Sequence, residues 1–225
     1  MNKYSLPYDV YERHKKVGSL IKGQKTVLDV GGEMNHLSQF TSAKKITVAN
    51  LDSGDVIITK DILPFAKDSF DVATAIDVLE HIPQDKRKKF VKNLLDVAAE
   101  LVIISFPIGT KKHIEYEKKI LEWLKRQGRE IDYLKQHVAY GLPTQTEIRK
   151  IAENHDTRVI FSGDININKL LFKISIFDPH IKIIRKMVYF AKLIFNFLTN
   201  PFFYRLLADK SYSENVNRAY LIIKK

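Results

Sequence analysis

The sequence predicts an α/β protein built on a doubly wound, mostly parallel sheet of seven strands. Short apolar runs recur along the chain, helical patterns separate several of them, and glycine or polar residues follow their ends. Buried parallel strands read as such runs, and crossover helices connect them. We therefore expect one domain, with an N-terminal helix before the sheet and a helical insertion before its last strand.

The elements are expected in the following order. Spaced apolar residues predict a helix at 8–21 that packs against the edge of the sheet. The expected strands are residues 26–30, 46–49, 56–59, 70–76, 101–105, 158–161 and 219–223. We expect helices at 86–98, 114–126 and 144–154 and the start of a helix at 36–41, whereas residues 127–141 give irregular signals. Thr144 and Glu147 form a capping box that opens the third of these helices.

These patterns divide the chain into four segments. An N-terminal helical segment (1–25) precedes the core (26–164), which is followed by a basic, aromatic helical insertion (165–215) and the final strand (216–225). The insertion carries eight Lys or Arg against two Asp between residues 165 and 210. Residues 181–198 place a polar, basic stripe beside a broad apolar face. This pattern indicates a lid or a homodimer element, or a helix that contacts a membrane surface through residues 181–205.

Composition limits the function classes. The 225 residues contain no cysteine, which excludes disulfides and thiolate metal sites. The first 25 residues are too polar for a secretory signal, so we expect a cytoplasmic protein, with peripheral contact to the inner membrane face as an option. The net charge of +11 favours anionic partners: nucleic acid, a phosphorylated glycan or an anionic membrane.

Residues 61–83 carry the most informative motif, DILPFAKDSFDVATAIDVLEHIP. The run resembles the class I methyltransferases that use S-adenosylmethionine, in particular the small-molecule and glycan branch called methyltransferase type 11. Its members carry a run of the form D-x-LPF-x-x-x-SFD followed by D-V-L-E-H-I. The resemblance implies a Rossmann-like fold and methyl transfer from S-adenosylmethionine, by in-line displacement, to a hydroxyl of a small molecule or glycan precursor.

The same resemblance assigns a cofactor loop after the first strand. Asp29, Gly31 and Gly32 fit its acid and glycines, but Glu33 and Asn35 stand where further glycines are usual. Glu33 would repel the cofactor carboxylate unless its side chain turns towards solvent. Asparagine tolerates left-handed backbone, so Asn35 is the milder change.

Further cofactor contacts follow from the later motifs. An acid after the second strand usually binds both ribose hydroxyls, and that place falls on Asn50 or on Asp52. In the resembled family, the residue matching Asp61 accepts a bond from the adenine amino group, and Ile62 covers the ring. Asp77 would reach the methionine end from the tip of its strand.

Methyl transfer to a hydroxyl benefits from a general base, and histidine is the most suitable type. His81 is the first candidate and His137 the second, although His81 could serve only helix and loop packing. A divalent ion held by Asp77, Glu80, His81 and a remote histidine is a weaker alternative, and we expect no metal site.

Two other functions remain open. The basic cluster at residues 86–89 would suit an RNA methyltransferase, but it also fits the solvated face of a helix, and nucleic acid is not the expected partner. A non-catalytic interaction protein that keeps the fold without its cofactor is the third hypothesis, supported by Glu33, Asn35 and Asn50.

Overall fold

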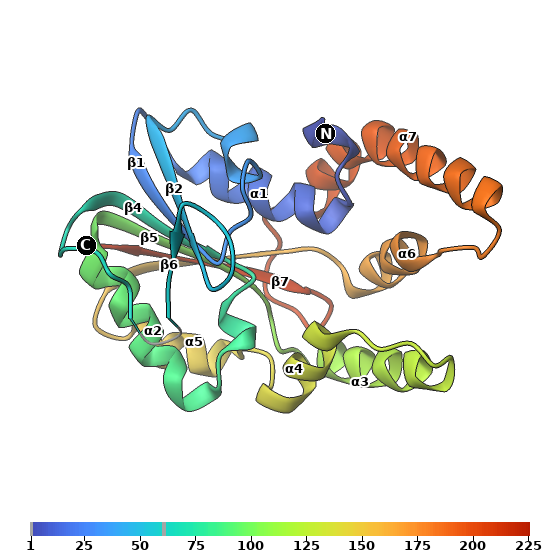
Figure 1. The fold of residues 1–225 in the computed structure, drawn as a ribbon. Coiled ribbons are helices and arrows are strands. Elements are labelled where there is room, and N and C mark those ends of the chain that lie inside the picture. The colour runs from blue at the N-terminus through green and yellow to red at the C-terminus, as the bar shows by residue number, and fades with distance from the viewer. Residues whose placement is uncertain (1, 60–61) are drawn as a thin grey trace.

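The computed structural model describes residues 2–59 and 62–225 and confirms the predicted fold class (Figure 1). Seven strands form one sheet in the order β3-β2-β1-β4-β5-β7-β6. All pairs are parallel except those of β7, which runs antiparallel to both neighbours. The strands are β1 (Thr26–Val30), β2 (Lys45–Asn50), β3 (Val56–Ile57), β4 (Phe70–Ile76), β5 (Ala98–Pro107), β6 (Asp156–Ser162) and β7 (Arg218–Lys224).

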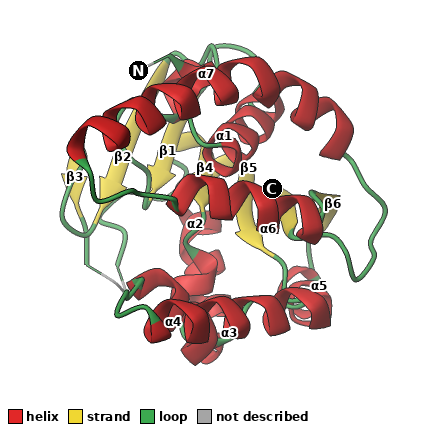
Figure 2. Cartoon of the chain, turned by 90° about the vertical axis from the view of Figure 1, so that its right-hand side faces the viewer, coloured by secondary structure: helices red, strands yellow, loops and turns green. Residues whose placement is uncertain are grey.

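Helices cover the two faces of the sheet and extend beyond one end of it, as Figures 1 and 2 show. They are α1 (Tyr8–Leu20), α2 (Gln84–Val97), α3 (Lys111–Arg126), α4 (Asp132–Tyr140), α5 (Gln145–Ala152), α6 (Ile165–Ile176) and α7 (Lys182–Leu207). Short 3-10 turns complete the set: η1 (Lys3–Ser5), η2 (Leu37–Gln39) and η3 (Leu79–His81).

Alternation along the strands divides the core between the two faces. On β1, Val27 packs with Val17 and Ile21 of the N-terminal segment. Leu28 points the other way, into a larger cluster that contains Leu94 of α2 and Ile148 of α5. A strand presents successive side chains to opposite faces, so one short apolar strand contributes to both layers.

Three local expectations need correction. The helix expected from residue 36 is only the single turn η2, which ends with Phe40 as its C-cap. The backbone carbonyl of Phe40 packs closely on α1, 2.4 Å from where a Cβ at Gly18 would lie. Residues 127–141 contain α4, whose end at Gly141 takes the left-handed backbone that favours glycine. Half of the capping box forms: Thr144 accepts the Glu147 N–H, but the Glu147 carboxylate binds Arg87 instead of returning to the cap.

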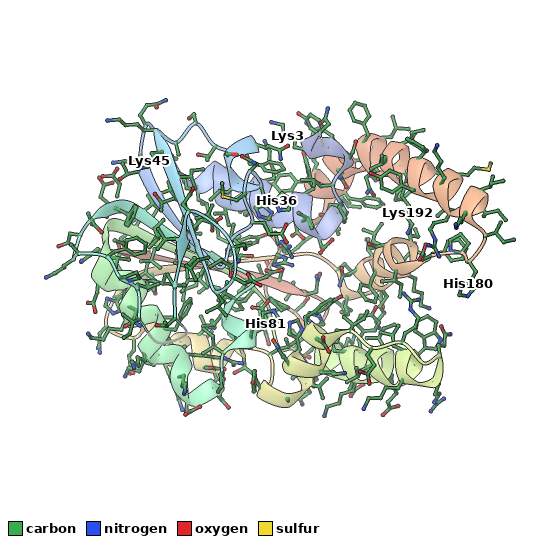
Figure 3. The ribbon with its side chains drawn as sticks, in the orientation of Figure 1. Lys3, His36, Lys45, His81, His180 and Lys192 are labelled. Atoms are coloured by element: carbon green, nitrogen blue, oxygen red, sulfur yellow. The ribbon has the colours of Figure 1, made fainter. Side chains whose placement is uncertain are left out.

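The insertion forms two helices, α6 and α7. Lys192 of α7 donates to the carbonyls of Ser175 and Phe177 at the end of α6, and Figure 3 labels it between the two helices. Asn200 ties α7 to the N-terminal segment through the carbonyls of Tyr4 and Leu6. Within the described part of the chain, no helix combines the length and apolar character that crossing a membrane requires.

Candidate functional site

The loop after β1 lies at the carboxyl edge of the sheet, where ligands of open α/β sheets bind. Gly31 takes a positive φ of 75° and donates its N–H to the Ala49 carbonyl at 2.7 Å. Gly32 passes directly over Asp29, since a Cβ at this position would lie 2.1 Å from the Asp29 Oδ2 atom. The two glycines therefore let the loop lie close to the ends of β1 and β2.

Asp29 is fully buried beneath this loop. Its Oδ1 atom accepts a hydrogen bond from the Thr74 hydroxyl at 2.8 Å. Burial raises the pKa of Asp29 to about 7, and the bond from Thr74 opposes that shift. Asp29 therefore packs beneath the loop at Gly32 and is not exposed at its surface.

Glu33 and Asn35, which stand where glycines are usual, both fit into the loop after β1. The Glu33 side chain is 74% exposed, with its carboxylate 3.3 Å from the Nδ1 atom of His36. This is the outward orientation that removes the repulsion considered for Glu33. Asn35 takes a φ of 67°, the left-handed conformation for which asparagine is suited.

Asn50 joins the end of β2 to the glycine loop. Its Nδ2 atom donates to the Gly32 carbonyl at 3.1 Å, and its Oδ1 atom accepts the N–H of Leu51 at 2.7 Å. Asp52 is exposed in the following turn, and Ile62 is 65% exposed. Asp61, predicted to contact adenine, lies outside the described residues.

Asp77, at the tip of β4, is the most heavily paired carboxylate of the site. Arg218 of β7 donates to both of its oxygens, and Arg13 of α1 donates to Oδ2. Burial by itself raises the pKa of Asp77, but the two guanidinium groups outweigh it and hold the pKa well below its ordinary value. Asp77 also takes a positive φ of 55°, which turns the chain sharply after the strand.

A second buried carboxylate, Glu12, lies beside this group. Ser162 donates to it, and its Oε2 atom is 3.8 Å from the Arg218 Nε atom. Burial raises the pKa of Glu12, which favours its neutral form. Two arginines facing one ionised Asp77 leave a net positive charge at this edge of the sheet.

The two histidines predicted as bases lie together although 56 positions separate them in the sequence. Their ring centroids are 4.9 Å apart. The Nδ1 atom of His81 is 2.8 Å from the Gln136 Oε1 atom, and the Nδ1 atom of His137 is 2.9 Å from the Glu117 Oε1 atom. Burial, followed by the neighbouring His137, lowers the pKa of His81. Figure 3 shows His81 where the turn after β4 approaches the α3 and α4 helices.

Sequence reasoning missed the partners of these side chains. Arg13 and Arg218 lie 64 and 141 positions from Asp77, and neither belongs to a local motif. Glu117 is one of many charged residues on α3 and gave no signal of its own. Its spacing from His113, one helical turn earlier, was the only available hint.

A cavity of about 1160 Å³ opens on the neighbouring face of α3. Tyr116, Ile120 and Trp123 form its apolar wall. Its cationic residues are Lys119, Arg129, Lys169, Lys173 and Arg185, and Asp178 is its only acid among the described residues. The cavity therefore suits a ligand with an apolar part and a negative charge.

Comparison with known proteins defines the fold. No family model and no curated protein matches the sequence. Among solved structures, a SAM-dependent methyltransferase from Archaeoglobus fulgidus aligns with a TM-score of 0.55 at 13% identity, covering 100% of this chain and 97% of that one. A methyltransferase from Thermotoga maritima, described as a possible histamine N-methyltransferase, aligns with a TM-score of 0.55 at 10% identity, covering 99% and 91%.

The chain has the class I methyltransferase fold. The cyclase SpnF has a similar structure, with a TM-score of 0.52 at 9% identity over 96% of this chain and 80% of that one. A likeness of this kind establishes the class I fold, and the chemistry has to be argued from the residues at the site.

Proposed function

We propose that this protein transfers a methyl group from S-adenosylmethionine to a hydroxyl of an anionic small molecule, such as a glycan precursor. The observation that carries the proposal is the position of the predicted cofactor residues in the class I fold. Asp29 and Asn50 lie in β1 and β2, Gly32 and Asp77 follow the ends of β1 and β4, and all four therefore lie at one carboxyl edge of the sheet. Dispersed polar residues that meet at this edge are typical of a ligand site in an open α/β sheet.

The residues present fit the cofactor. The Asp29 carboxylate fills the space that a Cβ at Gly32 would need, so only glycine lets the loop backbone lie this close to the end of β1, where the cofactor would bind. Asp52 would bind the ribose hydroxyls together with Asn50, and the exposed Ile62 would cover the adenine ring. The amino-acid end of S-adenosylmethionine carries both an ammonium and a carboxylate. Arg13 would hold the carboxylate, and Asp77 would hold the ammonium through the second lone pair of its Oδ1 atom, which accepts one bond from Arg218.

Arg13 replaces a feature that the glycine loop lacks. In many nucleotide sites, the N-terminus of the following helix binds the negative group, but here the loop is followed only by the turn η2. The two arginines around Asp77 supply positive charge at the same edge of the sheet. A guanidinium can bind a carboxylate through two parallel hydrogen bonds.

The chemistry needs positioning more than covalent help. S-adenosylmethionine supplies a sulfonium methyl group, whose S–C bond breaks with its electron pair returning to sulfur as the acceptor oxygen forms the new O–C bond. The protein has to align the acceptor and exclude water. We assign activation of the acceptor to His81 and His137, because each Nδ1 atom faces an oxygen and leaves Nε2 free for a proton or a cation.

The cavity beside α3 supports an anionic acceptor. Glu117 and Tyr116 are consecutive on this helix, so the helix that positions His137 also lines the cavity. Five Lys or Arg around an apolar wall suit a phosphorylated or lipid-linked sugar. An acceptor of this kind would place the enzyme in glycan biosynthesis.

We also propose peripheral contact with an anionic membrane surface through residues 181–205, which would place a cytoplasmic enzyme at the inner membrane face. Apolar side chains that are about half to three-quarters exposed cover α7: Ile183, Met187, Phe190, Ile194, Leu198 and Phe202. Lys182, Arg185 and Lys186 are exposed at the same end of the helix. Apolar and cationic groups on one helix are typical of interfacial helices, and a homodimer is the competing use of this face.

The histidine pair provides a direct test of catalysis. His81→Ala and His137→Ala should each lower kcat by about 10²–10⁴-fold, with the affinity for S-adenosylhomocysteine nearly unchanged. Turnover would be followed as S-adenosylhomocysteine release with phosphorylated sugars as acceptors. His155→Ala, at an exposed position, is the control. Wild-type turnover in both variants would exclude a role for either histidine.

A non-catalytic protein with this fold is the second candidate. The reduced glycine pattern and the single turn η2 favour it, since both weaken the usual loop. Calorimetry with S-adenosylhomocysteine distinguishes the two functions. Binding supports the methyltransferase, and no binding at millimolar ligand supports the non-catalytic protein.

A further inference from the structure

Three side chains capable of binding metal converge next to the predicted cofactor edge. Glu80 and His81 belong to the turn η3 after β4, and His137 belongs to α4. One ligand atom from each lies within 4.8 Å of the other two. The Glu80 Oε1 atom is 4.0 Å from the His81 Nε2 atom.

Two of these residues have buried polar atoms that the protein does not satisfy. Glu80 is 1% exposed and His137 is 7% exposed. Among the described residues, neither the Glu80 Oε2 atom nor the His137 Nε2 atom has a hydrogen-bond partner. Buried polar atoms nearly always have a partner, and two orphaned atoms in one cluster require an explanation. A cation between them would satisfy both.

Hydrogen bonds at Nδ1 orient the imidazoles of His81 and His137 and set their tautomers. The Oε1 atoms of Gln136 and Glu117 accept from the Nδ1 atoms of His81 and His137, at 2.8 and 2.9 Å. An imidazole that donates through Nδ1 presents an unprotonated lone pair at Nε2. Metal-binding histidines are commonly oriented by a carboxylate or another oxygen in this way. Both Nε2 atoms are therefore in the form that binds a cation.

Asp77, considered from the sequence as a fourth ligand, lies outside the cluster in which the ligand atoms are within 4.8 Å of one another. Arg13 and Arg218 occupy both of its oxygens. One carboxylate and two imidazoles remain, a donor set typical of zinc and of other divalent transition metals. Ligand atoms around zinc, each about 2.1 Å from it, lie about 3.4 Å apart. Small side-chain rotations would close the 4.0 Å gap between Glu80 and His81 to that spacing.

We propose that Glu80, His81 and His137 bind a divalent transition-metal ion of the zinc class, with Glu117 and Gln136 orienting the two imidazoles. Three protein ligands leave an open position on the ion, as in catalytic zinc sites. The role of that position rests on the proposed methyl transfer. An acceptor hydroxyl bound there would release its proton to solvent at neutral pH, because the ion stabilises the alkoxide. The histidines would then act as ligands instead of accepting the proton.

Metal titration of the full-length, tag-free protein tests the site without the cofactor. Calorimetry with Zn²⁺ should give one tight equivalent for the wild type. Glu80→Gln and His137→Ala should weaken binding at least about 100-fold, and Glu117→Gln about 10–100-fold. His155→Ala, on an exposed loop residue, should bind as the wild type does. Co²⁺ absorption in the visible range gives an independent readout of the same ligands.

Wild-type affinity in both Glu80→Gln and His137→Ala, or no stoichiometric binding by the wild type, overturns the metal site. Thermal unfolding in the presence of a chelator shows that each variant is folded, and Glu80→Gln keeps the shape of the side chain. Binding of S-adenosylhomocysteine is measured separately, so failure of the metal site and failure of the proposed methyl transfer are distinguishable.

Discussion

Arg218 on the last strand binds both carboxylate oxygens of Asp77 at the tip of β4, and it also donates to the Ser105 hydroxyl at 3.0 Å. β5 lies between these two strands in the sheet. The contact therefore connects the antiparallel end of the sheet to the edge where a ligand would bind. Arg13 adds α1 to the same group. One carboxylate thus joins three segments that are distant in the sequence.

Asp77→Asn should cost about 3–5 kcal/mol of unfolding free energy, because it leaves the buried Arg218 and the partly buried Arg13 without their counter-charge. Urea unfolding measures this change. Asp96→Asn is the matched control, since Asp96 pairs with Lys92 on an exposed helical face and its loss should cost less than about 1 kcal/mol. Equal losses in the two variants would contradict the structural role of Asp77.

The raised pKa of Asp29 should make the unfolding free energy depend on pH. Its pKa of about 7 in the folded protein lies above the ordinary 3.8, so the unfolded chain loses this proton first as the pH rises. The Asp29 contribution to stability therefore falls between pH 4 and pH 7, by up to roughly 4 kcal/mol, and is constant above that range.

Asp29→Asn removes this titration while keeping an acceptor for Thr74. The difference in unfolding free energy between wild type and variant should fall as pH rises through this window. Other groups that titrate there, such as the buried His14, are common to both proteins and cancel. Parallel stability curves for the two proteins would show that Asp29 does not retain its proton in the folded state.

Gly32→Ala tests the close approach of the loop to Asp29. The new methyl group would lie 2.1 Å from a carboxylate oxygen, so the loop has to move away from β1. We expect a loss of about 1–3 kcal/mol in stability and at least tenfold weaker binding of S-adenosylhomocysteine. Gly23→Ala has open space around it and should affect only stability, through its φ of 77°. Unchanged cofactor affinity in Gly32→Ala would remove this loop from the binding site.

The exposed apolar and cationic side chains of α7 should bind an anionic lipid surface. Vesicles containing phosphatidylserine should sediment with the wild-type protein at low salt and release it at high salt. Ile183→Asp and Met187→Asp, both at exposed positions, should abolish this binding without unfolding the protein. Concentration-dependent dimerisation that these substitutions abolish, with no lipid binding, would assign the surface to a second copy of the chain.

The fold was predictable because its signals are local. Apolar runs such as residues 70–76 and glycines such as Gly31 identify strands and the turns that follow them. Residues 127–141 were unclear because α4 is short, and its burial of Leu134 and His137 depends on packing against α3. The close contact between Phe40 and α1 depends on tertiary packing, which no local pattern reveals.

The candidate site was predictable as a set of residues but not as a set of partnerships. The sequence named Asp77, His81 and His137 from their positions in motifs. It could not indicate that Arg218 pairs with Asp77 or that Glu117 orients His137, because both contacts depend on tertiary packing. Both partners bear on the proposed chemistry, since Arg218 holds Asp77 in place and Glu117 leaves the His137 Nε2 atom unprotonated.

Calorimetry with S-adenosylhomocysteine and the full-length protein tests the central claim most directly. We expect one molecule bound per chain with a Kd in the micromolar range, which corresponds to about 6–8 kcal/mol of binding free energy. Arg13→Ala should weaken this binding at least tenfold, because Arg13 faces the proposed carboxylate position beside Asp77. No binding by the wild-type protein at millimolar ligand would contradict the assignment of this edge of the sheet as a cofactor site.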